Sequence, residues 1–453
     1  MIKNLPLLVL YFATLQIGCG KYTDAKPSEK DNIPSTLEDL QSILDNDPEL
    51  NQRSPKAADL SADDYFLTDL NLESLNAYER RTYIWSKREL FMKGNHNDWA
   101  YAYKNVNSAN VALTYLDKMK GTQEDLNNVK GQALFHRANA FLQVTFIWTL
   151  AYDEQTADTD LGIPLRLDAD PNKSTKRSTL RQTYEQIIND LKTAAGLLPL
   201  VPRGITRPSK PAAYALLARA YMAMRNYKEM GKYAILSLHY KNSLKDYNTL
   251  DTNSFILFPF APRFSNDAEI IFGSNIVHTP ALNYATAKID SSLYKSFSQN
   301  DLRKKVLFSD NSNATFGFKG NYSGTINLFS GIATNETYLM QAEYFARMDL
   351  IDSAMFVLNK LLEKRFVVNT FIPLKAGNAR EALYYIHEER RKELMMRGLR
   401  WMDVKRLNKE GANIRLKRIV NGQLYELLPD DPRYALPIPE DVIEMTGIEQ
   451  NRE

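Results

Sequence analysis

The chain has 453 residues, of which 44% are hydrophobic and 25% charged, with 57 Lys and Arg residues against 54 Asp and Glu residues. This composition is typical of a globular protein and excludes an intrinsically disordered or collagen-like chain. A formal net charge of +3 gives no basis for binding a phosphate backbone, and a single cysteine excludes an intramolecular disulfide and a Cys-rich zinc site.

The first nineteen residues resemble a bacterial lipoprotein signal. After Lys3, a largely apolar run covers 5–18 and ends at Gly18 and Cys19. This run is shorter than the about 20 residues that a membrane-spanning helix needs, but it suits a signal-peptide core. We therefore expect cleavage after residue 18 and acylation of Cys19, which would anchor the protein by this end only. An ordinary secretory signal that happens to end near a cysteine is the alternative.

Helical periodicity dominates the rest of the chain. Residues 19–35 are polar and predict a flexible tether, and Ser35 or Thr36 then caps a first helix. Further helices are predicted over 99–119, 123–150, 179–198, 210–225, 227–240, 336–348, 352–365 and 379–408. Between 241 and 335 the chain becomes rich in Asn, Ser, Gly, Phe and Tyr without a sustained helical period, and 420–453 is again irregular. The sequence thus predicts a mainly α protein with an irregular insert.

Two pairs of helical windows repeat one spacing of small and aromatic residues. The positions are Ala218, Tyr221, Met230 and Ala234 in one pair, and Ala342, Phe345, Ala354 and Leu358 in the other. Small residues at these positions let two antiparallel helices approach closely, while the aromatic ring fills the groove of the next pair. This arrangement is typical of tetratricopeptide repeats, and it predicts a scaffold with no catalytic role.

No known catalytic or metal-binding motif is present in the sequence. The five histidines (His96, His136, His239, His278 and His387) include no two at helical ligand spacing, and the acidic clusters lack the remainder of a calcium loop. We therefore predict no metal, no cofactor and no enzymatic activity, with a hydrolase as a minor alternative. The run 388–393 mixes Glu with Arg and Lys, and it predicts helical ion pairs such as Glu389–Lys392 and Glu393–Arg397.

Aromatic residues are the most informative feature outside the helices, with 25 Tyr, 20 Phe and 4 Trp. Rings interleaved with Asn, Ser, Arg and Asp can cover the C–H faces of a sugar or a peptide while polar groups take its hydroxyls or amides. For each single ring, packing is the competing interpretation. The candidate ligand-binding residues are Tyr78, Arg81, Tyr83, Trp85, Tyr284, Tyr294, Phe316 and Tyr322.

Several segments occur in an order that resembles one known family. They are 131–138, 161–165, 183–199, 210–219, 338–343, 389–394 with 397–406, and 436–439 with 450–451. Together they resemble the SusD/RagB family of Bacteroidetes outer-membrane lipoproteins. Arg397 departs from the family pattern, which usually has Glu before the following Gly, and we expect a local exchange of ion pairs there. Regions 54–98 and 241–335 show no match.

The resemblance implies a SusD-like fold: tetratricopeptide-like helix pairs that carry an irregular, loop-rich ligand-binding region. We expect one domain over 36–453, with the helix-pair scaffold mainly in 99–240 and 336–408 and the insert in 241–335. The resemblance also implies a lipid-anchored protein displayed at the outer membrane. Such a protein is expected to capture an oligosaccharide and deliver it to a partner TonB-dependent transporter of the SusC type. A peptide-binding protein of the same transport system and a helix-repeat scaffold for membrane protein assembly are the alternatives.

Overall fold

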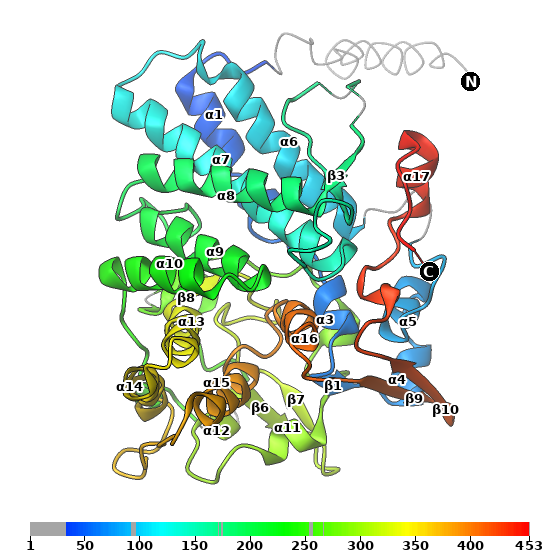
Figure 1. Ribbon diagram of the computed structural model, residues 1–453, viewed down its shortest axis with the longest axis vertical. Helices are drawn as coiled ribbons and strands as arrows, with labels where there is room; N and C mark the ends of the chain where they lie inside the picture. Colours follow the sequence, from blue (N-terminus) through cyan, green and yellow to red (C-terminus); the bar gives the residue numbers. More distant parts are fainter. Residues whose placement is uncertain are drawn as a thin grey trace, which may run out of the picture.

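A computed structural model describes residues 33–91, 97–170, 172–173, 175–252, 257–265 and 267–452. The expected signal segment and Cys19 lie outside these residues. The longer helices are stacked so that each packs against the next, from α6 at one end of the molecule to α15 at the other (Figure 1). The stack consists of α6 (Asp98–Leu116), α7 (Gln123–Trp148), α8 (Leu180–Leu197), α9 (Lys210–Ala223), α10 (Tyr227–Tyr240), α13 (Thr334–Arg347), α14 (Ile351–Glu363) and α15 (Ala379–Glu393).

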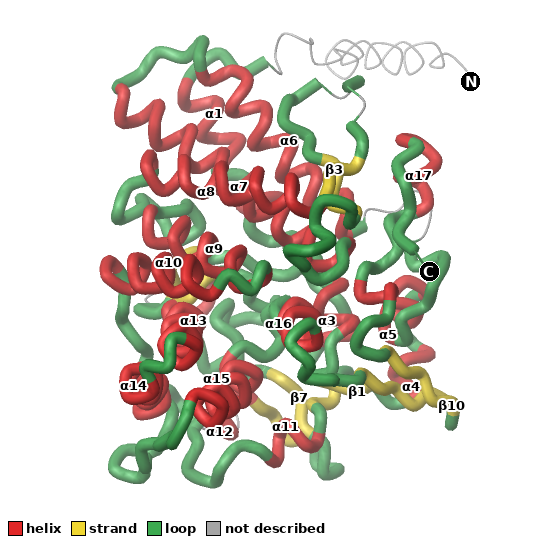
Figure 2. Tube along the Cα trace, viewed as in Figure 1, coloured by secondary structure: helices red, strands yellow, loops and turns green. Residues whose placement is uncertain are grey.

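Most of the shorter helices and strands lie along one side of this stack (Figure 2). The shorter helices are α1 (Leu37–Leu44), α2 (Asp47–Leu50), α3 (Ala57–Ser61), α4 (Asp69–Glu73), α5 (Ala77–Tyr83), α11 (Ser291–Lys295), α12 (Arg303–Leu307), α16 (Arg400–Asn408) and α17 (Glu440–Thr446). Single turns of 3₁₀-helix are η2 (Tyr247–Thr249), η3 (Pro262–Phe264), η4 (Pro280–Leu282) and η5 (Pro432–Tyr434).

The strands of the described residues form two-stranded antiparallel ladders. The pairs are β1 (Tyr65–Phe66) with β5 (Lys288–Ile289), β2 (Leu161–Pro164) with β3 (Arg177–Thr179), β4 (Ile270–Phe272) with β8 (Ile332–Ala333), β6 (Phe308–Asp310) with β7 (Phe316–Phe318), and β9 (Leu416–Val420) with β10 (Gln423–Leu427). β1 and β5 join the region before the stack to the insert, so these two unmatched regions of the sequence pack together.

The predicted helix pairs are confirmed as local structure. Ala218 and Ala234 are fully buried where α9 packs on α10, and Ala342 and Ala354 are fully buried where α13 packs on α14. Helix starts also follow the sequence. The Thr36 side chain accepts from Asp39 N while the Asp39 carboxylate accepts from Thr36 N, which is a capping box at the start of α1. The mainly α fold class is therefore correct.

The structure corrects two details of the window 379–408. The window contains two helices, α15 and α16, because the backbone turns between them with positive φ at Met396 (57°) and Gly398 (72°). The expected Glu389–Lys392 ion pair is present at 2.8 Å, but the expected Glu393–Arg397 pair is wrong. Since α15 ends at Glu393, Arg397 lies beyond the helix and contacts Glu336 of α13 instead, at 3.4 Å.

The insert and the region before the stack share a hydrophobic core of their own. It joins residues of α3–α5 to the segment between α10 and α13, whereas the main core runs along the helix stack. α10 packs directly on α13 although the insert separates them in the sequence. The helix stack is therefore continuous across the insert, and the insert packs against the side of the stack.

Candidate ligand-binding groove

The structure buries three of the predicted ligand-binding residues. Tyr83 and Trp85 are each 1% exposed, and the Trp85 indole donates from Nε1 to the Ser61 carbonyl at 3.0 Å. Tyr322 is 5% exposed, and it forms hydrogen bonds with Glu269 and Asn335 in the interior. Buried tyrosine and tryptophan usually satisfy their polar atoms in this way. These three rings therefore have structural partners, and a ligand could reach them only if the protein opened.

Tyr78 and Arg81 lie on α5 with part of each side chain accessible. The Tyr78 hydroxyl donates to Asp98 Oδ2 at 3.0 Å, and its ring stacks on Phe91 with centroids 5.0 Å apart. Arg81 forms an ion pair with Glu89 at 3.1 Å. Both side chains are thus engaged in local contacts, and neither lines the groove along α14 that is described below.

The remaining predicted residues gather in the insert. The rings of Tyr294 on α11 and Phe316 on β7 stack with centroids 3.6 Å apart and an interplanar angle of 10°. Lys304 Nζ lies 5.1 Å from the Tyr294 ring centroid. The backbone of Tyr284 approaches the same strand at Gly317. All three aromatic residues are half-buried, so this group stays a candidate ring surface that nothing in the structure assigns to a ligand.

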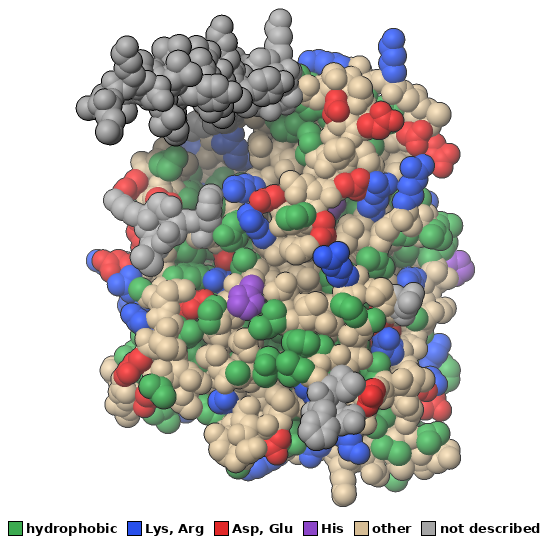
Figure 3. Space-filling model, turned by 180° about the vertical axis from the view of Figure 1, so that it is seen from behind, with side chains coloured by type: hydrophobic (Ala, Val, Ile, Leu, Met, Phe, Trp, Pro, Cys, Tyr) green, Lys and Arg blue, Asp and Glu red, His purple; other side chains and the backbone are tan. Residues whose placement is uncertain are grey.

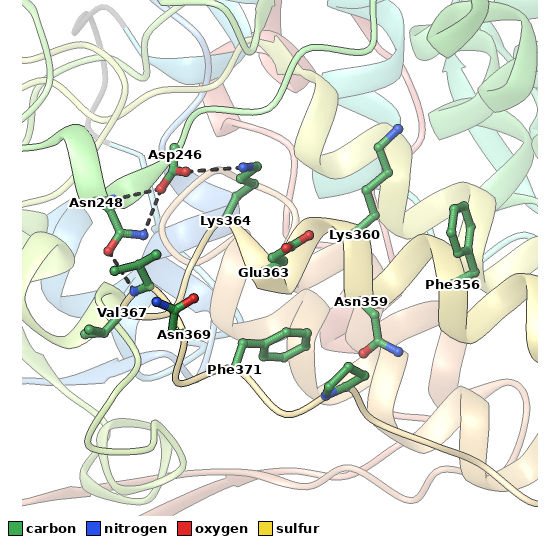
Figure 4. Close-up of a pocket in the computed structure, with 12 residues that line it drawn as sticks. Asp246, Asn248, Phe356, Asn359, Lys360, Glu363, Lys364, Val367, Asn369 and Phe371 are labelled. Atoms are coloured by element: carbon green, nitrogen blue, oxygen red, sulfur yellow. Dashed lines mark hydrogen bonds and ion pairs between the residues drawn. The ribbon is translucent and has the colours of Figure 1, made fainter.

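A groove with a mixed polar and apolar lining lies elsewhere, along α14 (Figure 4). Its volume is about 660 Å³, within the range of pockets that take small ligands. One wall is α14, and the other is made by the turn at η2 and the loop after α14. The lining residues are Asp246, Asn248, Phe356, Asn359, Lys360, Glu363, Lys364, Val367, Val368, Asn369, Phe371 and Pro373.

Two asparagine side chains fix the walls of this groove. Asn359 on α14 donates from Nδ2 to the Leu374 carbonyl and accepts from Leu374 N, both at 2.9 Å. Asn248 donates to the Phe366 carbonyl at 2.9 Å and accepts from Val368 N at 3.1 Å. Each amide therefore pairs with the backbone of the loop through both its donor and its acceptor. These contacts hold the loop at a set distance from the helix.

The charged residues that line the groove balance in number. Lys364 Nζ contacts Asp246 Oδ2 at 3.2 Å at one end of the groove. Burial opposes ionisation of Asp246, but N–H groups of Asn248 and the ammonium of Lys364 outweigh it and hold the pKa of this carboxyl below its usual value. Lys360 and Glu363 add one further charge of each sign. The Asp246 carboxyl is therefore ionised and paired, which does not suit it to donate or take a proton.

An exposed aromatic ring stands at the other end of the groove. Phe356 is 71% exposed, although its helical neighbours Ala354 and Leu358 are buried. Figure 4 shows Glu363, Asn369 and Phe371 around the middle of the groove, with Asp246 and Asn248 toward one end and Phe356 toward the other. A ring face beside an amide and charged groups suits a ligand that has both C–H surfaces and hydroxyls.

A smaller cleft of about 250 Å³ lies beside the C-terminal segment. Arg433 and Glu440 of this cleft are already engaged: Arg433 pairs with Asp431 at 2.6 Å, and Glu440 Oε1 accepts from Glu89 N at 2.7 Å. The face of the molecule in Figure 3 carries Lys and Arg side chains interspersed with Asp and Glu. The α14 groove is therefore the better candidate site for an uncharged ligand.

Sequence reasoning missed the groove, although one signal for it was present. Phe356, Lys360 and Glu363 share the solvent face of α14, because their spacing of four and seven residues returns to one side of a helix. An aromatic residue on this polar face does not point toward the core, so a role in packing does not account for it. The contribution of Asn248 and the loop carries no such signal, since only the fold brings them to α14.

Within the described residues, no group of three His, Cys, Asp or Glu side chains is arranged to hold a metal ion. Among these residues there is also no helix with the length and apolar character needed to cross a membrane.

Comparisons with known proteins agree with the helical architecture. A SusD-like family model, described as "Starch-binding associating with outer membrane", matches residues 21–222. A SusD superfamily protein from Bacteroides thetaiotaomicron has 21% identity and a TM-score of 0.72, over 92% of this chain and 100% of that one. The amino-terminal part of this chain is therefore similar to the SusD-like family. A putative sugar-binding protein from Bacteroides vulgatus has 22% identity and a TM-score of 0.73, over 92% of this chain and 99% of its own.

A SusD-like carbohydrate-binding protein from Bacteroides vulgatus has 20% identity and a TM-score of 0.66, and it covers 91% of this chain and 97% of its own. At these identities the solved structures establish the fold. No curated protein sequence matches the chain. The family description places such proteins in association with the outer membrane.

Proposed function

We propose that this protein is a member of the SusD/RagB family and a carbohydrate-binding protein that captures an oligosaccharide in the α14 groove. The observation that carries the proposal is the ring of Phe356, which is 71% exposed at one end of a groove of about 660 Å³. Such a ring offers an apolar face to the C–H side of a sugar. Lys360, Glu363 and Asn369 line the same groove and supply donors and acceptors for hydroxyl groups.

Binding without catalysis fits the state of the groove's polar groups. The Asp246 carboxyl is ionised and paired with Lys364, and the Asn248 and Asn359 amides are engaged by backbone. A glycosidase needs two carboxyl groups that flank the bond to be broken, one of them protonated. The groove contributes Glu363 as its other carboxylate, and no feature of its surroundings raises the pKa of Asp246 to make it the acid. We therefore propose a protein that holds its ligand unchanged.

The family description and the sequence support a place for this activity in nutrient uptake. We propose that Cys19 carries a lipid that anchors the protein at the cell surface of the outer membrane. There it would deliver the captured oligosaccharide to a SusC-like TonB-dependent transporter. Titration calorimetry of the protein against a panel of plant, bacterial and host oligosaccharides tests the ligand class directly. Binding of at least one glycan is expected, whereas binding of peptides alone would contradict the carbohydrate assignment.

Anchor and transporter partnership need their own tests. Labelling cells with a fatty-acid analogue is expected to mark the wild-type protein and not Cys19→Ala, and label that persists in the variant would contradict the anchor. Affinity purification from detergent-solubilised membranes is expected to recover a barrel transporter in a defined ratio to this protein. Recovery of other membrane proteins in its place would favour an assembly scaffold.

A further inference from the structure

Both lysines that line the α14 groove already have a partner in the protein. Lys364 Nζ lies 3.2 Å from Asp246 Oδ2, so these two charges compensate each other. Lys360 Nζ lies 5.3 Å from the centroid of the Tyr338 ring, and a cation is attracted to the face of such a ring. Figure 4 shows the Lys360 side chain extending away from Phe371. Neither ammonium group is therefore placed to receive an acidic ligand.

Glu363 is the charged residue of the groove that has no such partner. Its side chain is exposed, and within the described residues its carboxylate forms neither an ion pair nor a hydrogen bond. Figure 4 places it near the middle of the groove, with Asn369 and Phe371. The loop 366–373, which forms part of the opposite wall, contains no charged residue. A ligand in the groove therefore meets one uncompensated negative charge.

The position of Glu363 in α14 adds a second negative contribution. Glu363 is the last residue of α14, where the aligned backbone carbonyls give a helix its negative end. A carboxylate is disfavoured at this position, whereas a cation is favoured. Helix stability therefore does not account for Glu363. The carboxylate and the helix end both attract a positively charged group and repel a negatively charged one.

Cations that lie next to the groove in the sequence are engaged elsewhere. Lys245 pairs with Asp267 at 3.1 Å. Arg365 pairs with Glu269 and with Glu393, in each case at 2.7 Å. Neither is available to offset the charge at Glu363.

We propose that Glu363 sets the charge selectivity of the α14 groove: oligosaccharides with free amino groups bind more tightly than neutral ones, and acidic ones are rejected. This selectivity rests on the proposed function, because it concerns the ligand of the same groove. Phe356 covers the C–H face of a sugar unit, and Glu363 attracts an ammonium group or repels a carboxylate on the same chain. Since Glu363 is exposed, each charge on the sugar changes the affinity by about two- to fivefold.

Calorimetry with three series of oligosaccharides tests this selectivity. The probes are oligomers of glucosamine, of glucose and of glucuronate that share one linkage. For the wild type we expect the glucosamine oligomers to bind most tightly and the glucuronate oligomers most weakly. The differences should shrink as the ionic strength rises, because salt screens exposed charges.

Substitutions of Glu363 separate its charge from the shape of the groove. In Glu363→Gln the three series should bind with nearly equal affinity, and in Glu363→Lys the order should reverse. Asp352→Asn removes an exposed carboxylate from the same helix, outside the groove, and should keep the order of the wild type.

Two results would overturn the selectivity and leave the proposed function intact. One is an order in which neutral or acidic oligomers bind as tightly as the amino oligomers, or in which none of the three series binds while another glycan does. The other is a preference for amino oligomers that persists in Glu363→Gln. Absence of binding by any oligosaccharide would contradict the proposed function as well.

Discussion

Arg303 on α12 of the insert donates from Nη2 to Glu389 Oε2 on α15 of the helix stack at 2.6 Å. The same guanidinium donates to Glu393 at 3.1 Å and to Asp301 at 2.7 Å. Arg303 is 1% exposed, so water does not screen this contact. One arginine therefore compensates carboxylates from the insert and from the stack, and it fixes the insert to the side of the scaffold.

Removing this arginine is expected to destabilise the protein strongly. Arg303→Ala leaves buried carboxylates without their partner, which typically costs about 3–5 kcal/mol. Urea unfolding followed by circular dichroism should show a much lower midpoint than for the wild type. Lys305→Ala, two residues away on the exposed side of α12, is the control and should change the free energy of unfolding by less than about 0.5 kcal/mol. Equal effects of the two substitutions would contradict this role.

Asp59 is expected to make the protein less stable as the pH rises toward neutrality. Burial raises the pKa of its carboxyl to about 7, against about 3.9 in an unfolded chain. Between these values the native state holds a proton that the unfolded chain has released, so the free energy of unfolding falls as the pH increases. Since one pKa unit corresponds to about 1.4 kcal/mol, the loss from pH 4 to pH 8 amounts to a few kcal/mol.

Comparison with Asp59→Asn isolates this contribution. The amide is uncharged at every pH and keeps an acceptor for Gly398 N, so this variant should lack the decline. His136 acts in the opposite direction in both proteins, because burial lowers its pKa to about 4 and its protonation opposes folding in acid. Free energies of unfolding measured from pH 4 to pH 8 should therefore diverge between the two proteins. Parallel curves would show that Asp59 titrates normally.

Gly231 is required where α10 meets α13. A Cβ atom built on Gly231 would lie 2.0 Å from the Tyr344 ring, which must then move. Gly231→Ala gains up to about 1 kcal/mol of helix propensity but loses about 1–3 kcal/mol to overpacking, so net destabilisation is expected. Gly196→Ala in α8 is the matched control, because nothing lies within 4 Å of its added methyl group and it should stabilise the protein. Thermal unfolding should show a lower melting temperature for Gly231→Ala and a higher one for Gly196→Ala than for the wild type.

Asn359 is expected to affect ligand binding through the loop after α14. Asn359→Ala removes the two hydrogen bonds to Leu374, and the loop should become more mobile at a cost of about 1–2 kcal/mol. Hydrogen exchange of residues 366–374 should speed up, and affinity for the glycan should fall without loss of the helical fold. Unchanged exchange in this loop would show that other contacts position it.

The sequence predicts the helix stack well, because the spacing of apolar residues within each segment is enough to indicate a helix and its buried face. Ala218 and Ala342 occur at the period that a buried helix face requires, and both are fully buried. The prediction fails where a helix ends: the Glu393–Arg397 pair presumes a helix through 397, but α15 stops at Glu393. Nothing local in the sequence shows that Arg397 instead reaches Glu336, which is 61 residues away.

The candidate site was harder to predict, because exposure is a property of the fold. Trp85 and Tyr322 lie outside periodic segments, as ligand-binding rings often do, yet each is buried against distant partners such as Ser61 and Asn335. Phe356 lies within a periodic helix and is exposed. Tertiary packing decides whether such a ring is buried or exposed. A single sequence does not show which distant residues pack against it.

Glycan binding by Phe356→Ala tests the central claim most directly. Once the panel identifies a glycan, calorimetry should show at least a tenfold weaker affinity for this variant, as expected for the loss of about 1.4 kcal/mol of ring contact. Tyr384→Ala removes another exposed ring, 61% accessible on α15 and outside the groove, and should bind as the wild type does. Equal affinities for wild type, Phe356→Ala and Tyr384→Ala would contradict the assignment of the α14 groove as the binding site.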